Sequence, residues 1–254
     1  NKARNIRLAS SRINGMIIHP GETFSFWRTV GKTSKRKGYR DGRIIIGDKL
    51  IPGLGGGLCN LGNTIHLLVL HSPLTVTEFH SHSDALAPDH GKRVPFSSGT
   101  SVSYNYIDYR FKNNTDQNVQ LLLWCEKGKL CGELRSEKEF PHYYEIIEEN
   151  HHFHQEKEKF FRISQIYRNV IDRSTGKITD KELIRDNHSE VMYDYDQIPP
   201  ELEIRGVRDG SANAGVLKPE IISQDLNYQS GSLEVRLTGS LRGIRTSVSY
   251  THLR

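Results

Sequence analysis

Residues 52–73, PGLGGGLCNLGNTIHLLVLHSP, contain the pattern that decides the fold. Apolar residues recur here at intervals of three and four, which predicts a helix that ends before Pro73. They are Leu58, Leu61, Ile65, Leu68 and Val69. The glycines at 55–57 let the backbone before this helix approach another group closely, and they leave the first N–H groups of the helix free to face an anion.

Cys59 falls in the first turn of this predicted helix. The positive end of the helix dipole stabilises a thiolate there, and nearby backbone N–H groups can stabilise an oxyanion. Cys59 is therefore a candidate nucleophile, with Gly56, Gly57 and Leu58 as candidate oxyanion donors.

The segment 75–82 alternates and is rich in β-branched and aromatic residues, which predicts a strand. Alternation places Glu78, His80 and His82 on one face of it. Either histidine is a candidate base for Cys59, and His82 is favoured because it lies nearer the strand end, where loops bring in acids. Candidate orienting acids are Asp84, Asp89 and Asp108, and candidate substrate contacts are Glu78 and Asn60.

Two other interpretations stay open for the same residues. The glycines could serve helix packing alone, with Cys59 as a core thiol and the histidines on the surface. Alternatively, His80 and His82 could bind a metal together with Asp89 or His90. Because His-x-His alone is a weak metal signal, we expect no metal and no cofactor.

The remaining pattern predicts an α+β domain in which the Cys-bearing helix packs on an antiparallel sheet. A helix is predicted at 1–18, a hairpin at 44–51, and strands at 102–111 and 119–125. Cys125 and Cys131 flank a polar turn, so they either form a disulfide across a hairpin or are two reduced core residues.

Beyond the first 135 residues the composition of the sequence becomes more polar and the apolar periodicity ends. Residues 136–204 form a polar, variable extension that we expect to be partly helical and partly disordered. Residues 205–254 are rich in Gly and Ser, and the last of them resemble the peptide encoded by sequencing-adapter DNA. We expect this tail to be non-native.

Composition excludes several classes of protein. No uncharged apolar run approaches the roughly 18–20 residues needed to cross a bilayer, and three cysteines are too few for a disulfide framework. The net charge of +5 comes with no recognisable nucleic-acid-binding module. The basic cluster within 32–40 could contact phosphate-rich polymers or could be a solvated loop. The chain starts at Asn1 without Met or a leader, so we expect an upstream segment to be missing, and the compartment stays unknown.

Several motifs, in order, resemble those of the VanW family over residues 1–135. They are Pro20–Phe26, Val30-Gly31, Gly38-Tyr39, Gly55–Cys59, Glu78–Ser83, Ile107-Asp108 and Phe111–Thr115. The resemblance implies a bacterial cell-wall or glycopeptide-resistance context. The family usually has Gln where this chain has Asn60, and an acid in the stretch held here by 99–101, so Asp108 becomes the better acidic candidate.

Two hypotheses about function follow. The first is a cysteine-dependent acyl-transfer or amidase-like activity on peptidoglycan peptides, with Cys59 as nucleophile and His82 or His80 as base. The alternative is a non-catalytic module that binds peptidoglycan or a glycopeptide through the same site. Substrate and oligomeric state are not readable from the sequence.

Overall fold

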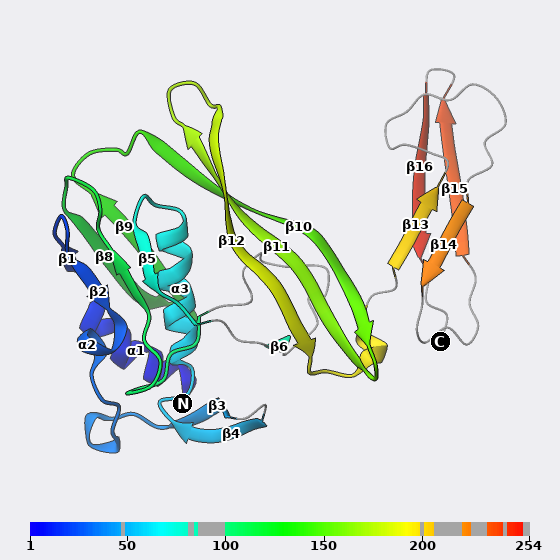
Figure 1. The fold of residues 1–254 in the computed structure, drawn as a ribbon. Helices are drawn as coiled ribbons and strands as arrows, with labels where there is room; N and C mark the ends of the chain where they lie inside the picture. The colour runs from blue at the N-terminus through cyan, green and yellow to red at the C-terminus, as the bar shows by residue number, and fades with distance from the viewer. Residues whose placement is uncertain are drawn as a thin grey trace. The chain divides into compact units, whose positions relative to one another are not determined.

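The computed structural model describes residues 1–46, 49–80, 84–85, 100–198, 201–205, 220–224, 233–240 and 243–250. Backbone contacts divide the chain into two compact units, Asn1–Met192 and Tyr193–Arg254 (Figure 1). The predicted α+β class is confirmed, because the first unit combines helices with antiparallel sheets. Within the described residues, no helix has the length and apolar character needed to cross a membrane.

Residues 1–136 form the helices and short strands around the core. The helical segments of this part are α1 (Lys2–Ile13), α2 (Phe26–Val30), the 3-10 turn η1 (Lys35–Lys37) and α3 (Leu58–Leu70). Its strands are β1 (Met16–Ile18), β2 (Thr23–Ser25), β3 (Asp41–Ile46), β4 (Lys49–Leu54), β5 (Thr75–Glu78), β7 (Arg110–Lys112), β8 (Val119–Glu126) and β9 (Lys129–Ser136). They form the antiparallel sheets β1-β8-β9 and β2-β7-β5 and the hairpin β3-β4.

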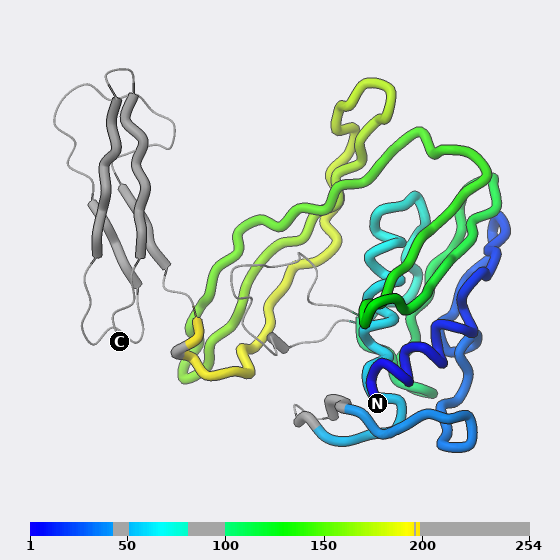
Figure 2. Tube along the Cα trace, turned by 180° about the vertical axis from the view of Figure 1, so that it is seen from behind, coloured from blue at the N-terminus to red at the C-terminus, as the bar shows by residue number. Residues whose placement is uncertain are grey.

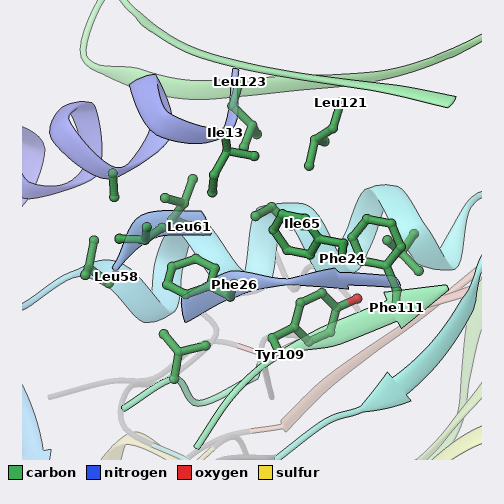
Figure 3. Packing of buried hydrophobic residues seen from close by; sticks show 14 of the residues in the cluster. Ile13, Phe24, Phe26, Leu58, Leu61, Ile65, Tyr109, Phe111, Leu121 and Leu123 are labelled. Atoms are coloured by element: carbon green, nitrogen blue, oxygen red, sulfur yellow. The ribbon is translucent and has the colours of Figure 1, made fainter. Parts of the chain in front are cut away.

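The predicted helix α3 packs in the middle of the hydrophobic core. Leu61, Ile65 and Val69 are fully buried, as their helical spacing requires. Figure 3 shows Leu61 and Ile65 between two groups of side chains. One group comes from α1 and β8 (Ile13, Leu121, Leu123), and the other from β2, α2, β7 and the residue before β7 (Phe24, Phe26, Tyr109, Phe111).

The strand predicted at 102–111 is wrong over most of its length. Ser103 and Ile107 exchange backbone hydrogen bonds of 2.9 and 2.8 Å and close a turn, and Asn105 inside it adopts a positive φ of 66°. Only Arg110–Lys112 is a strand, paired with both β2 and β5. The predicted strand at 75–82 also ends early, at Glu78, and residues 81–83 lie outside the described chain.

The hairpin around Cys125 and Cys131 is confirmed, and both cysteines are free. Its two-residue turn, Lys127 and Gly128, has positive φ at both positions, which suits the twist of paired strands. Cys125 is paired with Leu130, and Cys131 with Trp124, so the two thiols project from opposite faces of the hairpin. This register favours the reduced pair.

The polar extension is not partly helical. It forms three long antiparallel strands, β10 (His142–Glu156), β11 (Lys159–Asp172) and β12 (Ile178–Val191), which Figure 2 shows as the green-to-yellow part of the tube. β12 also pairs in parallel with the short β6 (Asp84–Ala85). One face of β11 and β12 buries polar residues, among them Arg162, Ser164 and Asn187, so burial alternates although hydrophobicity does not.

The extension sheet touches the end of α3, where Arg168 donates to the carbonyl of Ser72 at 3.3 Å. A domain boundary at 135/136 stays a prediction. In the second unit, after the 3-10 turn η2 (Tyr195–Gln197), β13 (Glu201–Arg205) pairs with β14 (Glu220–Gln224), and β15 (Leu233–Ser240) with β16 (Gly243–Tyr250). The non-native origin of residues 205–254 also stays a prediction.

Candidate functional site

The glycine run before α3 is held in place by Asn5, a fully buried residue of α1. Its amide nitrogen donates to the carbonyls of Arg40 at 2.8 Å and Gly56 at 3.0 Å, and its amide oxygen accepts from the N–H of Arg40 at 2.9 Å. Gly57 caps α3 with a φ of 101°, and a Cβ there would collide with Lys2. A residue with a side chain would therefore displace the helix start.

Cys59 is the second residue of α3 and is partly buried against the core. Its thiol donates to the carbonyl oxygen of Val102 at a sulfur–oxygen distance of 3.8 Å. One turn further on, Gly62 lies against Thr100 and Val102. The same face of α3 therefore meets the segment 100–102 at both positions.

His66 lies on that face of α3 two turns beyond Cys59, about 10 Å along the axis. Its ring is buried, stacks on Phe79 with centroids 4.7 Å apart, and shares a 3.1 Å hydrogen bond with the phenol of Tyr109. Burial, and secondarily the positive charge of Arg185, lowers the pKa of His66 to about 4. His66 is therefore neutral at physiological pH.

A polar cluster gathers around Asp108, where β2, β7 and β5 pair. The carboxylate of Asp108 accepts four hydrogen bonds at 2.6–3.0 Å. The donors are the Ser25 hydroxyl, the backbone N–H groups of Trp27 and Tyr109, and Nε of Arg110. Burial alone would raise the pKa of Asp108, but these hydrogen bonds outweigh it and lower the pKa below its ordinary value.

Arg110, Glu78 and His80 complete the cluster on its exposed side. Nε of Arg110 lies 2.8 Å from Asp108 Oδ2 and 3.3 Å from Glu78 Oε2, and the arginine side chain is 50% exposed. Glu78 Oε1 accepts from the N–H of Asp108 at 3.1 Å and lies 3.3 Å from Nε2 of His80. Within the described chain the contacts of Arg110 all use Nε, and two carboxylates hold this atom in place.

Aromatic side chains border this cluster. Trp27 donates its indole N–H to the carbonyl of Ile107 at 2.8 Å and meets Tyr104 edge-on at 5.5 Å. Tyr106, at the tip of the turn closed by Ser103 and Ile107, is 87% exposed. Aromatic side chains with a few placed polar groups are typical of ligand-binding sites.

Comparison with known proteins places these residues in a family. A family model described as "VanW like protein" matches residues 1–135. The chain is also 30% identical over 193 residues to the vancomycin B-type resistance protein VanW of Enterococcus faecalis, covering 76% of this chain and 70% of that protein. The chain belongs to the VanW family.

A second bacterial protein is also similar to this chain. The uncharacterised protein YoaR of Bacillus subtilis is 33% identical over 121 residues, which cover 47% of this chain and 38% of YoaR. No solved structure matches the chain.

The VanW-like domain brings together only some of the residues predicted for the site. Asp108, Glu78 and His80 form one cluster, whereas Cys59 contacts Val102 instead. His82, the favoured base, lies outside the described residues, as do the side chains of Asp84 and Asp89. The cluster and the thiol are nevertheless neighbours. The N–H of Ser101 donates to the His80 carbonyl at 2.6 Å, so that carbonyl lies within about 13 Å of the Cys59 sulfur.

The predicted oxyanion donors differ in their availability. The N–H of Gly56 already donates to the carbonyl of Gly53 at 3.3 Å. Gly57 and Leu58 lie at the start of α3, where the first N–H groups have no partner within the helix. Asn60, the other predicted substrate contact, is exposed on the first turn.

Sequence reasoning missed Arg110, Ser25 and His66 as parts of this region. Ser25 joins Asp108 only through the pairing of β2 with β7 across 83 residues, which no local pattern shows. Arg110 lies only two residues from Asp108, so strand alternation could have placed the two side chains on one face. One sequence feature could have indicated that His66 is buried, namely its position inside an apolar helical run. Within the described residues, no group of three or more His, Cys, Asp or Glu side chains could hold a metal ion, and the rival ligands His82, Asp89 and His90 fall outside them.

Proposed function

We propose that this VanW-family chain is a cell-wall protein associated with glycopeptide resistance, and that it binds a peptidoglycan peptide or a glycopeptide at the Asp108–Arg110 cluster. The observation that carries the proposal is the orientation of Arg110. Two carboxylates hold Nε, and within the described residues no contact of Arg110 uses its terminal amino groups, which can donate to ligand oxygens.

The binding module is favoured over an enzyme because His66 and His80 make their contacts with residues other than Cys59. His66 is buried against Tyr109 and neutral, and the ring of His80 contacts Glu78. The thiol of Cys59 donates to a carbonyl oxygen, which is not a general base. A nucleophilic cysteine needs the opposite arrangement, with a base within hydrogen-bond reach.

Titration of the protein with a muramyl pentapeptide and, separately, with vancomycin tests the proposal, with tryptophan fluorescence as the readout because Trp27 borders the cluster. Arg110→Gln should weaken binding tenfold or more, since it removes the charged donors. Arg135→Gln is the matched control, because Arg135 is also exposed and paired with one carboxylate, Glu133, outside the cluster. Unchanged affinity in Arg110→Gln, or no binding by the wild-type protein, contradicts the proposal.

Cysteine-dependent acyl transfer is the second candidate, and the position of Cys59 at the N-terminus of α3 favours it. In a Cys125→Ser/Cys131→Ser background, iodoacetamide should then alkylate Cys59 at pH 6 faster than it alkylates free cysteine. His82→Ala should abolish the excess rate, and His80→Ala should leave most of it. A rate equal to that of free cysteine would remove this candidate.

A further inference from the structure

The N-terminal part of the chain carries a concentration of positive charge that the cluster at Asp108 does not use. Residues 1–42 contain ten Lys or Arg and only two acidic residues, whereas the rest of the chain has more acidic than basic residues. All ten of these basic side chains are exposed. Such an asymmetry is typical of a surface that meets a polyanion.

The fold joins two basic segments into one surface. We define the basic surface as the α1 residues Lys2, Arg4, Arg7 and Arg12 together with the loop residues Lys32, Lys35, Arg36, Lys37 and Arg40. Nε of Arg4 donates to the carbonyl of Gly38 at 2.9 Å, and the backbone of Arg40 is bonded on both sides to Asn5. Arg12 also lies close enough to Tyr39 to affect its ionisation. Burial raises the pKa of Tyr39, and the positive charge of Arg12 lowers it by a smaller amount.

The basic surface is rigid and nearly uncompensated. Nζ of Lys37 donates to the carbonyl of Lys32 at 2.8 Å, and the Ser34 hydroxyl caps η1, so the loop has a fixed shape. Among the described residues, the ion pair found on this surface is Lys35–Asp41 at 4.0 Å, between two exposed side chains. A pair of this kind contributes little.

We propose that the basic surface binds a linear phosphodiester polymer of the cell wall. Its α1 residues extend from Lys2 to Arg12, ten steps along the helix or about 15 Å, so a chain of regularly spaced phosphates can neutralise several of them at once. Five of the nine side chains are arginines, which match phosphate geometry with two donors.

A lipid bilayer fits this surface less well. A helix that lies in a membrane interface buries an exposed apolar face, but α1 already buries Ile6, Ala9 and Ile13 in the core. The large apolar side chain found exposed within residues 1–42 is Ile17, which belongs to β1 and not to the basic surface.

Binding of fluorescently labelled, delipidated poly(glycerol phosphate) to the full chain tests the proposal. Arg7→Gln/Lys35→Gln/Arg36→Gln should weaken binding tenfold or more. Within the described chain the contact found for these three side chains is the exposed ion pair of Lys35 with Asp41, so the variant should keep the wild-type circular dichroism spectrum. The control Lys129→Gln/Lys138→Gln/Lys177→Gln removes the same charge elsewhere and should change the affinity less than twofold.

Salt gives a second measurement that needs no variant. If four phosphates are neutralised, and the polymer behaves like a single-stranded nucleic acid, raising NaCl from 50 to 200 mM should weaken binding about 50-fold. The proposal is overturned if the polymer does not bind at 50 mM NaCl or if both triple variants weaken equally. Tighter binding to phosphatidylglycerol vesicles or to duplex DNA than to the polymer also overturns it. Because the basic-surface variants leave Arg110 intact, peptide binding at the Asp108 cluster should not change, and the two proposals can fail separately.

Discussion

Protonation of His66 should make the stability of the protein depend on pH between 7 and 4. The folded state holds this ring neutral, with a pKa of about 4, because it is buried and lies near Arg185. The unfolded chain takes up the proton near pH 6.5, so between these values the unfolded state binds more protons. The stabilising contribution is therefore complete above pH 6.5 and is lost as the pH falls toward 4.

The size of the effect follows from the difference between the two pKa values. A shift of about 2.5 units corresponds to roughly 3 kcal/mol in total, of which about 2 kcal/mol should be lost between pH 7 and pH 5. Urea unfolding at pH 7, 6 and 5, followed by circular dichroism, measures it.

A glutamine at position 66 removes this proton equilibrium. His66→Gln stays neutral, so its free energy of unfolding should fall by about 2 kcal/mol less over the same pH range than that of the wild-type protein. His71→Gln is the matched control, because His71 is an exposed histidine on the last turn of the same helix. The reasoning is refuted if the wild-type protein and His66→Gln show the same pH dependence, or if NMR titration gives His66 an ordinary pKa.

Three further predictions concern the supports of the site and the cysteines. Asp108→Asn should lower the free energy of unfolding at pH 7 by about 2 kcal/mol, because a charge-assisted hydrogen bond is lost. Since the pKa of Asp108 is lowered on folding, this contribution is present above about pH 4 and lost below it, so urea unfolding at pH 3 should show a smaller difference between the two proteins. Asn5→Ala should cost about 2–5 kcal/mol in urea unfolding, because buried backbone groups, including the Gly56 carbonyl, lose their partner. The unfolded, unreduced protein should show three free thiols by reagent counting, whereas one thiol would contradict the register that separates Cys125 from Cys131.

The sequence predicts α3 and the β8-β9 hairpin well because both are specified locally. A helical repeat of apolar residues and a two-residue turn with positive φ act over a few residues. The sequence does not predict the sheet of β10, β11 and β12, because its strands lack a local pattern of apolar residues. Its buried face carries Arg162, Ser164 and Asn187, so the period of two exists in burial but is absent from hydrophobicity. Strand alternation is visible in a sequence only when the buried face is apolar.

The candidate site shows the same division between local and long-range signals. The position of Cys59 is readable, because glycines followed by a helical repeat define a helix N-terminus. The contacts of Asp108 with Ser25 and Glu78 cannot be read from the sequence, because they form only after β2 and β5 have paired with β7.

These contacts also decide what Asp108 can do. A general acid or base must exchange a proton near neutral pH, and an acid that orients a histidine must have a lone pair free for it. The carboxylate of Asp108 is held ionised by four donors, and none of them is a histidine. Its strongest geometric effect is on Arg110, whose Nε it fixes at 2.8 Å. We therefore expect Asp108, the acid that sequence reasoning assigned to catalysis, to act as a positioning residue for Arg110. Its loss should reduce ligand affinity through Arg110 and leave the alkylation rate of Cys59 unchanged.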